Sequence, residues 1–195
     1  MATADETLAI SDPERRALAA LDRADPRAAL AVLMEAYGTP LYRFCRQLVG
    51  DDALAEDVLQ MTFVQAHDGL PRFARRSSLS TWLFGIARHR CLDALKAARR
   101  RRARFQLVAD PPEAPDGGAA ADERLAARSL RGALRRCLDK LAPAVRTAVL
   151  LRFQEDLSYP EMALVCGARP PALQARVARA LPALRRCLES EGVRP

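Results

Sequence analysis

The fold is decided by residues 158–189, which read SYPEMALVCGARPPALQARVARALPALRRCLE. Ser158 and Glu161 have the spacing of a capping box, in which each side chain satisfies a backbone N–H of the other residue. This spacing predicts a short helix that ends at Gly167, followed by a longer helix that begins near Pro170. Together they form a helix-turn-helix pattern, although any antiparallel helical pair can imitate it.

The composition of the whole chain extends this prediction to an all-α protein. Of its 195 residues, 50% are hydrophobic, 28% are charged and 5% are aromatic, which allows a core and excludes wholesale disorder. Ala, Leu and Arg dominate, a mixture that favours helices over sheets. The net charge of +7 and the pI near 9.7 favour a polyanionic partner.

Changes in composition divide the chain into four segments. The predicted domains are an N-terminal extension 1–25, a first small helical domain 26–106, a flexible acidic Pro/Gly/Ala linker 107–123 and a second small helical domain 124–190. In the extension, Asp12-Pro13 opens a short helix.

The sequence also predicts where the protein is located. The chain has no apolar run of about 18 residues, and its acidic start lacks the pattern of a signal peptide, so we expect no membrane insertion and a cytoplasmic location.

The five cysteines are odd in number and include no CxxC pair, so a disulfide framework is not expected. Buried thiols that act as small apolar residues are favoured over a redox switch. These cysteines are Cys45, Cys91, Cys137, Cys166 and Cys187.

Helix signals recur in the first domain. Gly50 ends one helix, and Asp51 or Asp52 begins the next. Ser80 is the expected cap of a long helix from Thr81 to about Arg102. At 100° per residue, the apolar face of this helix holds Leu83, Phe84, Ala87, Cys91, Ala94, Leu95 and Ala98. The opposite face holds Trp82, His89, Asp93, Lys96 and Arg100.

Enzymatic signals are missing from the sequence. The two histidines, His67 and His89, lie on different predicted helices without a second ligand at metal spacing, and there is no glycine-rich phosphate loop or nucleophile elbow. The carboxylate pairs fit capping and solvation better than acid–base chemistry. We therefore expect no enzyme, no metal and no cofactor.

Nucleic-acid binding has stronger support. Residues 99–104 contain five arginines in six positions, whose mutual repulsion a polyanion relieves, although cations also favour a helix C-terminus. Trp82 lies beside this basic region and could stack on a base or be a packing residue. In the final helix, one side is lined by the apolar residues Leu173, Val177, Ala180, Leu181, Leu184 and Leu188. On the outward side, Arg176, Arg179 and Arg186 alternate with alanines, which predicts backbone contacts and modest base discrimination.

Three segments resemble bacterial sigma factors of the extracytoplasmic-function (ECF, group IV) type in the sigma-70 family. LYRFCRQLVGDDALAEDVLQMTFVQAH (41–67) is similar to the polymerase-binding segment, with its AED-x-x-Q-x-x-F motif. FARRSSLSTWLFGIARHRCLDALKAARRRR (73–102) is similar to the promoter-melting and −10-recognition segment. LDKLAPAVRTAVLLRFQEDLSYPEMALVCGARPPALQARVARALPALR (138–185) is similar to the −35-binding domain.

The resemblance implies an initiation factor with two helical domains, resembling sigma regions 2 and 4, that bind promoter DNA and the clamp helices of the largest RNA polymerase subunit. An anti-sigma partner is also expected. The implied polymerase contacts are Glu56, Asp57, Gln60, Met61 and Phe63. The implied DNA contacts are Arg75, Arg76, Ser80, Trp82, Arg88, His89, Asp93, Lys96, Arg99, Arg100, Arg169, Gln174, Arg176 and Arg179.

The sequence departs from the family pattern in three places. His89 replaces the usual asparagine after Ile-Ala-Arg, which alters the expected −10 preference. At the start of the last helix, Ala172 and Ala175 remove the hydroxyls of the usual Thr-Val-Lys-Ser-Arg pattern, and Gln174 replaces its lysine. Pro182 falls inside the last helix, where it removes a backbone bond. These changes predict weakened or altered −35 reading, or a second domain partly retuned for another partner.

Two alternatives remain open. A helix-turn-helix regulator would bind duplex DNA without polymerase and would need a dimerisation surface. An adaptor would sequester a partner through its apolar grooves and would support no promoter-dependent transcription.

Overall fold

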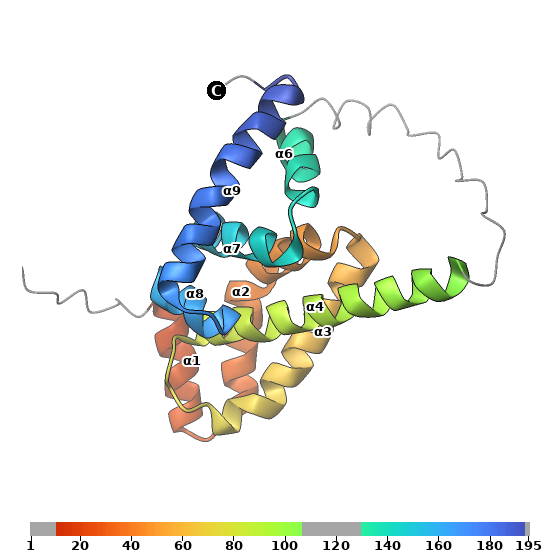
Figure 1. The fold of residues 1–195 in the computed structure, drawn as a ribbon. Coiled ribbons are helices and arrows are strands. Elements are labelled where there is room, and N and C mark those ends of the chain that lie inside the picture. The colour runs from red at the N-terminus through yellow and green to blue at the C-terminus, as the bar shows by residue number, and fades with distance from the viewer. Residues whose placement is uncertain (1–10, 107–129, 194–195) are drawn as a thin grey trace, which may run out of the picture.

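The computed structural model describes residues 11–106 and 130–193, and every regular element in these ranges is helical, which confirms the all-α prediction (Figure 1). No described helix is both long and apolar enough to span a membrane. The elements are α1 (Asp12–Asp22), α2 (Pro26–Val49), α3 (Asp52–Gly69), the 3-10 turn η1 (Leu70–Arg72), α4 (Leu79–Gln106), α6 (Leu130–Asp139), α7 (Pro143–Phe153), α8 (Tyr159–Cys166) and α9 (Pro170–Ser190).

Local capping explains most of the helix ends. Ser158 and Glu161 form both bonds of the predicted capping box before α8. Gly50 and Gly167 end α2 and α8 with φ values of +84° and +63°, a conformation that glycine adopts without strain. Asp51 accepts a 2.8 Å hydrogen bond from the Leu54 N–H at the start of α3.

The start of α4 differs from the prediction. The helix begins at Leu79, and the side chain of Ser78, not Ser80, accepts the backbone N–H of Thr81 at 3.0 Å. The N–H of Leu79 is accepted by the carboxylate of Glu14 in α1. A partner from another helix therefore moves this boundary, and sequence-local capping rules do not include such a partner.

Helices α1 to α4 form the N-terminal half (Figure 1). Its interior holds Leu33 and Leu41 of α2 and Leu83 of α4, all fully buried, and the rings of Phe44 and Phe84 meet edge to face with centroids 5.5 Å apart. Each such side chain stabilises the fold by about 1.5–3 kcal/mol through its burial. This core fixes α4 against α2 and leaves one face of α4 for function.

Helices α6 to α9 form the C-terminal half, where Leu173, Val177, Ala180 and Leu184 of α9 are buried as expected. Leu181 does not follow the predicted stripe, because it faces an open groove and is 44% exposed. Helix α9 continues through Pro182 to Ser190.

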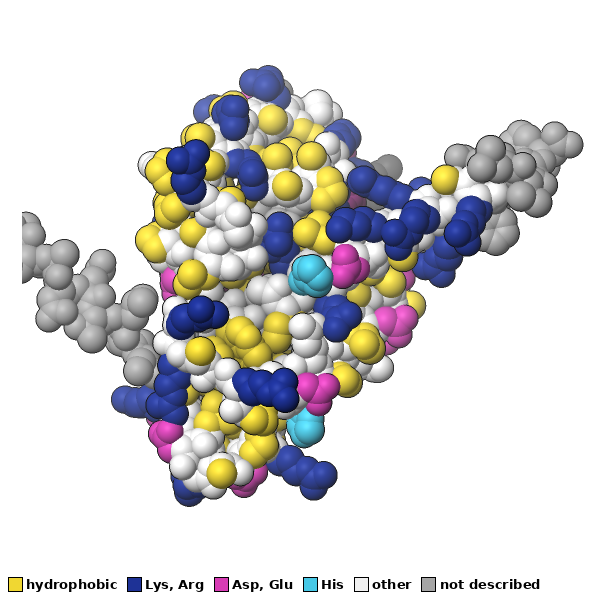
Figure 2. Space-filling model, turned by 60° about the horizontal axis from the view of Figure 1, so that its bottom comes forward, with side chains coloured by type: hydrophobic (Ala, Val, Ile, Leu, Met, Phe, Trp, Pro, Cys, Tyr) yellow, Lys and Arg dark blue, Asp and Glu magenta, His cyan; other side chains and the backbone are white. Residues whose placement is uncertain are grey.

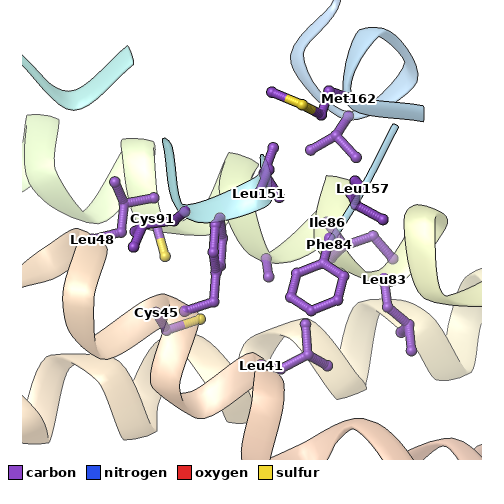
Figure 3. Close-up of a cluster of buried hydrophobic side chains, with 14 of the residues drawn as sticks. Leu41, Cys45, Leu48, Leu83, Phe84, Ile86, Cys91, Leu151, Leu157 and Met162 are labelled. Carbon is purple, nitrogen blue, oxygen red and sulfur yellow. The ribbon is translucent and has the colours of Figure 1, made fainter. Parts of the chain in front are cut away.

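The two halves pack against each other. Leu157 and Met162 belong to one cluster with Phe84 and Ile86 of α4 (Figure 3). Arg146 of α7, only 8% exposed, donates to the carbonyls of Gln47 and Leu48 at 3.3 Å each. The carbonyls at the end of α2 thus find donors in the other half. The linker proposed for residues 107–123 lies outside the described residues.

The cysteines depart from the prediction at one pair. Cys137 of α6 and Cys187 of α9 form a disulfide across 50 positions of sequence, so the expectation that the cysteines stay unpaired was wrong for these two. Helix packing brings them together, and spacing along the chain gave no sign of it. Cys45 and Cys91 are free and buried, as expected (Figure 3).

Candidate nucleic-acid interface

The loop before α4 and the first turn of that helix are held by side chains from two elements. Ser78 caps Thr81, and Glu14, which is itself buried, accepts the Leu79 N–H. Ser80 is half-buried, and its hydroxyl lies 3.0 Å from that of Ser78. The first turn of α4 is therefore fixed before any ligand arrives.

Two arginines project from this loop. Arg75 forms an ion pair with Asp22 of α1, and its backbone has a φ of +55°, which is uncommon for a residue with a side chain. Arg76 is exposed. The loop therefore offers one guanidinium oriented by α1 and one open to solvent.

Trp82 forms part of a pocket. Its ring tilts against Phe73 with centroids 5.3 Å apart, and its far edge lies so close to Gly69 that a Cβ there would be 2.8 Å from a ring carbon. The pocket has a volume of about 550 Å³ and includes the polar side chains of Gln65, Arg76 and Ser77. Trp82 is thus both a packing residue and a wall of a cavity open to solvent. The sequence left these two roles as alternatives.

The exposed face of α4 carries a small charge network. A carboxylate oxygen of Asp93 lies 3.2 Å from the Nε2 of His89, and the other lies 3.6 Å from the Nζ of Lys96, with which Asp93 forms an ion pair. One turn further on, Arg99 and Arg100 are exposed. Lys and Arg side chains gather along the projecting C-terminal part of α4 (Figure 2). This arrangement is a basic stripe that a phosphate backbone can follow.

Arg88, expected on the DNA side, lies instead against the C-terminal half. It is half-buried beside Cys166 of α8, and its Nε has no hydrogen-bond partner within the described ranges. Burial raises the pKa of the Cys166 thiol, and the charges of Arg88 and Arg176 oppose that rise. In this arrangement α8 therefore covers both arginines in part.

The start of α9 presents a different set of side chains. Arg169 stands at the N-cap, and Gln174 and Arg179 are exposed on the helix. The Nε of Arg179 donates to the Ala175 carbonyl at 3.2 Å, which holds the guanidinium close to its own helix. Ala172 and Ala175 are exposed and offer no hydrogen bonds to a ligand.

A second surface lies on α3. Glu56, Asp57, Gln60 and Met61 are exposed, whereas Phe63 is buried with its edge lining a groove of about 660 Å³ between α2 and α3. This groove also exposes Met34 and Val64, two residues that the motif did not include. Val64 follows Gln60 by four positions, so helical spacing could have identified it.

Three comparisons bear on these surfaces. Residues 33–101 match the family model of sigma-70 region 2, and residues 131–184 match that of sigma-70 region 4. The chain is 34% identical over 184 residues to the ECF RNA polymerase sigma factor SigC of Mycobacterium tuberculosis, covering 91% of this chain and 94% of that protein.

Two solved structures share the fold. The structure of CnrH in complex with the cytosolic domain of CnrY covers 92% of this chain and 99% of CnrH, with a TM-score of 0.65 and 25% identity. The sigma factor RpoE of Bartonella quintana, solved in complex with the anti-sigma factor NepR, covers 80% of this chain and 94% of RpoE, with a TM-score of 0.64 and 24% identity. The exposed basic face of α4 lies within the match to region 2, and α9 begins within the match to region 4.

Proposed function

The chain belongs to the ECF RNA polymerase sigma factors, and from this membership we propose how its surfaces act in transcription initiation. It is an initiation factor that directs RNA polymerase to promoters. The first domain (26–106) binds the polymerase and the opened −10 element, the second domain (124–190) binds the −35 element, and residues 107–123 link the two. The pocket beside Trp82 is the observation that carries this assignment.

The −10 element is held by the loop before α4 and by α4 itself. An extruded base costs a few kcal/mol of lost stacking, and the pocket offsets this with the Trp82 ring and the polar groups of Gln65 and Ser77. Stacking on an aromatic ring contributes about 1–3 kcal/mol per base. Arg75, Arg76 and the exposed basic residues of α4 neutralise the flanking phosphates.

The −35 element is contacted by the start of α9. Arg169, Gln174 and Arg179 are exposed there and can reach phosphates or base edges. Because Ala172 and Ala175 provide no hydrogen bond, this helix discriminates weakly between bases and serves mainly to position the duplex.

The polymerase is contacted through α3. Glu56, Asp57, Gln60 and Met61 form a mixed acidic and apolar surface, and the adjoining groove adds Met34 and Val64. We assign this surface to the clamp helices of the largest polymerase subunit. With both halves bound to one polymerase, two modest affinities combine through a high effective concentration.

The packing of the two halves has a consequence for DNA binding. Because α8 covers Arg88, this arginine contacts the −10 element only after α8 has moved away. Both solved relatives are bound to another protein, RpoE to the anti-sigma factor NepR and CnrH to the cytosolic domain of CnrY. We assign this chain an anti-sigma partner too, together with a cytoplasmic location and a non-enzymatic role without a cofactor.

Run-off transcription tests the proposal. Purified chain, core RNA polymerase and candidate promoter templates should yield defined transcripts that Asp57→Ala and Trp82→Ala reduce. The matched control is Arg16→Ala, which removes an exposed arginine of α1 that none of the proposed contacts includes. A helix-turn-helix regulator would bind duplex DNA but neither associate with core polymerase nor start transcription, and that result would refute the assignment.

A further inference from the structure

The disulfide between α6 and α9 joins two helices that also pack against each other through apolar side chains. The Cα atoms of Cys137 and Cys187 are 5.7 Å apart, within the range that a disulfide can bridge without backbone movement. The remaining polar links from α6 to the end of α9 run through Glu191, which accepts from Arg136 at 2.6 Å and from Lys140 at 3.4 Å.

The surroundings of this pair favour thiol chemistry. The Nζ of Lys140 lies 3.6 Å from the Sγ of Cys187, and its positive charge favours the thiolate, the form of cysteine that attacks an oxidant. The carboxylate of Glu191 lies within 4.8 Å of the same sulfur and opposes this effect. Cys187 is half-buried, and Cys137 is buried directly behind it. One sulfur is therefore reachable and the other is placed to resolve the product.

The other cysteines do not combine these features, because Cys45 and Cys91 are both buried and Cys166 is not bonded to a second cysteine. Cys45 and Cys91 are buried together, and their mutual hydrogen bond and burial raise the pKa of the Cys91 thiol. Burial also raises the pKa of Cys166. The raised pKa values keep Cys91 and Cys166 as neutral thiols, which react slowly with oxidants, and Cys45 is fully buried.

We propose that Cys137 and Cys187 are a reversible oxidation site whose oxidant is hydrogen peroxide. The Cys187 thiolate attacks the peroxide oxygen, breaks the O–O bond and becomes a sulfenic acid, and one water leaves after protonation. The Cys137 thiol then attacks that sulfur, the S–S bond forms and a second water leaves. Two thiols lose two electrons, and hydrogen peroxide is reduced to two waters.

The proposal rests on the proposed function only for its reducing compartment, where protein disulfides are usually transient. Closing the bond ties α6 to α9. Both helices line a groove of about 560 Å³, with Leu134 and Leu138 on one side and Leu184 and Leu188 on the other. Oxidation would therefore restrain the width of this groove, whereas reduction would leave α6 held by its apolar packing, by Glu191 and by the ion pair between Asp139 and Arg146.

The test uses the full chain alone, without polymerase or DNA, so its failure is distinct from failure of the proposed function. The chain is reduced with dithiothreitol and treated with hydrogen peroxide, and the cross-linked peptides are identified by mass spectrometry under non-reducing conditions. We expect a single 137–187 linkage, a melting temperature raised by on the order of 10 °C, and full reversal by dithiothreitol.

Variants sharpen the result. Cys137→Ser should leave a persistent sulfenic acid at Cys187, whereas Cys166→Ser should close as the wild type does. Lys140→Gln should slow closure several-fold without changing the final linkage. The proposal is overturned by a linkage between other cysteines, by a bond that dithiothreitol does not reopen, or by an unchanged melting temperature. Cys137, Cys187 and Glu191 could also hold a metal ion, and stoichiometric zinc that blocks the oxidation would overturn it as well.

Discussion

Glu14, in the first helix, accepts the backbone N–H of Leu79, the residue that begins the helix carrying Trp82. The two positions lie 65 residues apart in sequence. Asp22 of the same first helix pairs with Arg75. Helix α1 precedes the segment that matches sigma-70 region 2. Its side chains nevertheless bind the loop assigned to the −10 element at two points, at Arg75 and at Leu79.

Replacing Glu14 tests whether α1 sets the start of α4. Glu14→Ala leaves a buried N–H without its acceptor, so it should lower the free energy of unfolding by about 1–3 kcal/mol. Glu14→Gln keeps an acceptor oxygen and should cost less. Denaturant unfolding measures both. Asp12→Ala, at an exposed site, should change stability by no more than about 0.5 kcal/mol, and an equal loss there would rule out the specific role of Glu14.

Trp82 is the only tryptophan in the chain. Trp82→Ala should weaken binding of the holoenzyme to a fluorescent single-stranded −10 oligonucleotide by roughly 5- to 150-fold, because one base loses its stacking partner. Trp82→Phe keeps a ring and should retain most of the affinity. If the alanine variant binds as tightly as the wild type, the pocket is not a base site.

The basic stripe of α4 should appear in the salt dependence of DNA binding. Arg99→Ala with Arg100→Ala removes two phosphate contacts, so the slope of log K against log[salt] should become shallower by about 1.4–1.8. Titrations of promoter DNA at several salt concentrations measure this slope. Arg16→Ala should leave it unchanged, and an equal effect of that control would argue against a specific stripe.

Arg146 should control how the two halves sit together. Its removal leaves the carbonyls of Gln47 and Leu48 without these donors, so Arg146→Ala should cost about 1–3 kcal/mol and increase the radius of gyration measured by small-angle X-ray scattering. Arg135→Ala, which removes one exposed 3.2 Å bond to the Gly50 carbonyl, should have a smaller effect. Unchanged scattering for both variants would mean that the apolar contacts alone hold the halves.

Glu191 should make part of the stability depend on pH. Hydrogen bonds from Arg136, helped by Lys140, hold the pKa of its carboxyl below the usual value. The folded pKa is therefore the lower one, so this contribution is complete above the unfolded pKa and is lost as pH falls through the folded pKa. The stability difference between wild type and Arg136→Gln should be greatest at neutral pH and vanish in acid. NMR titration of Glu191 should give a higher pKa in the variant.

Much of the helix layout was predictable because its signals are local. The Ser158–Glu161 box, the Gly50 and Gly167 stops and the Asp51 cap each depend on residues within one turn. The start of α4 was misplaced because its first N–H is satisfied from α1. Leu181 was assigned to the core because the apolar spacing along a helix does not show which part of its apolar face another helix covers.

The candidate site likewise has residues that the sequence identified and residues that it missed or misplaced. Motif spacing identified the exposed residues of α3 and the basic face of α4, but it did not include Met34, which joins that surface from α2. It also placed Arg88 on an open face, whereas α8 covers this arginine. Both differences depend on a second helix.

The amino-acid order by itself determined the helical class, the positions of most helix ends and the family, because periodicity, capping and motifs act over a few neighbouring residues. Tertiary structure alone decided the Cys137–Cys187 bond, the Arg146 contacts to α2 and the Glu14 cap of α4. Each joins groups at least 50 positions apart. Such pairs meet only when the buried apolar faces of the helices pack against one another, and that packing depends on the shape of the whole core.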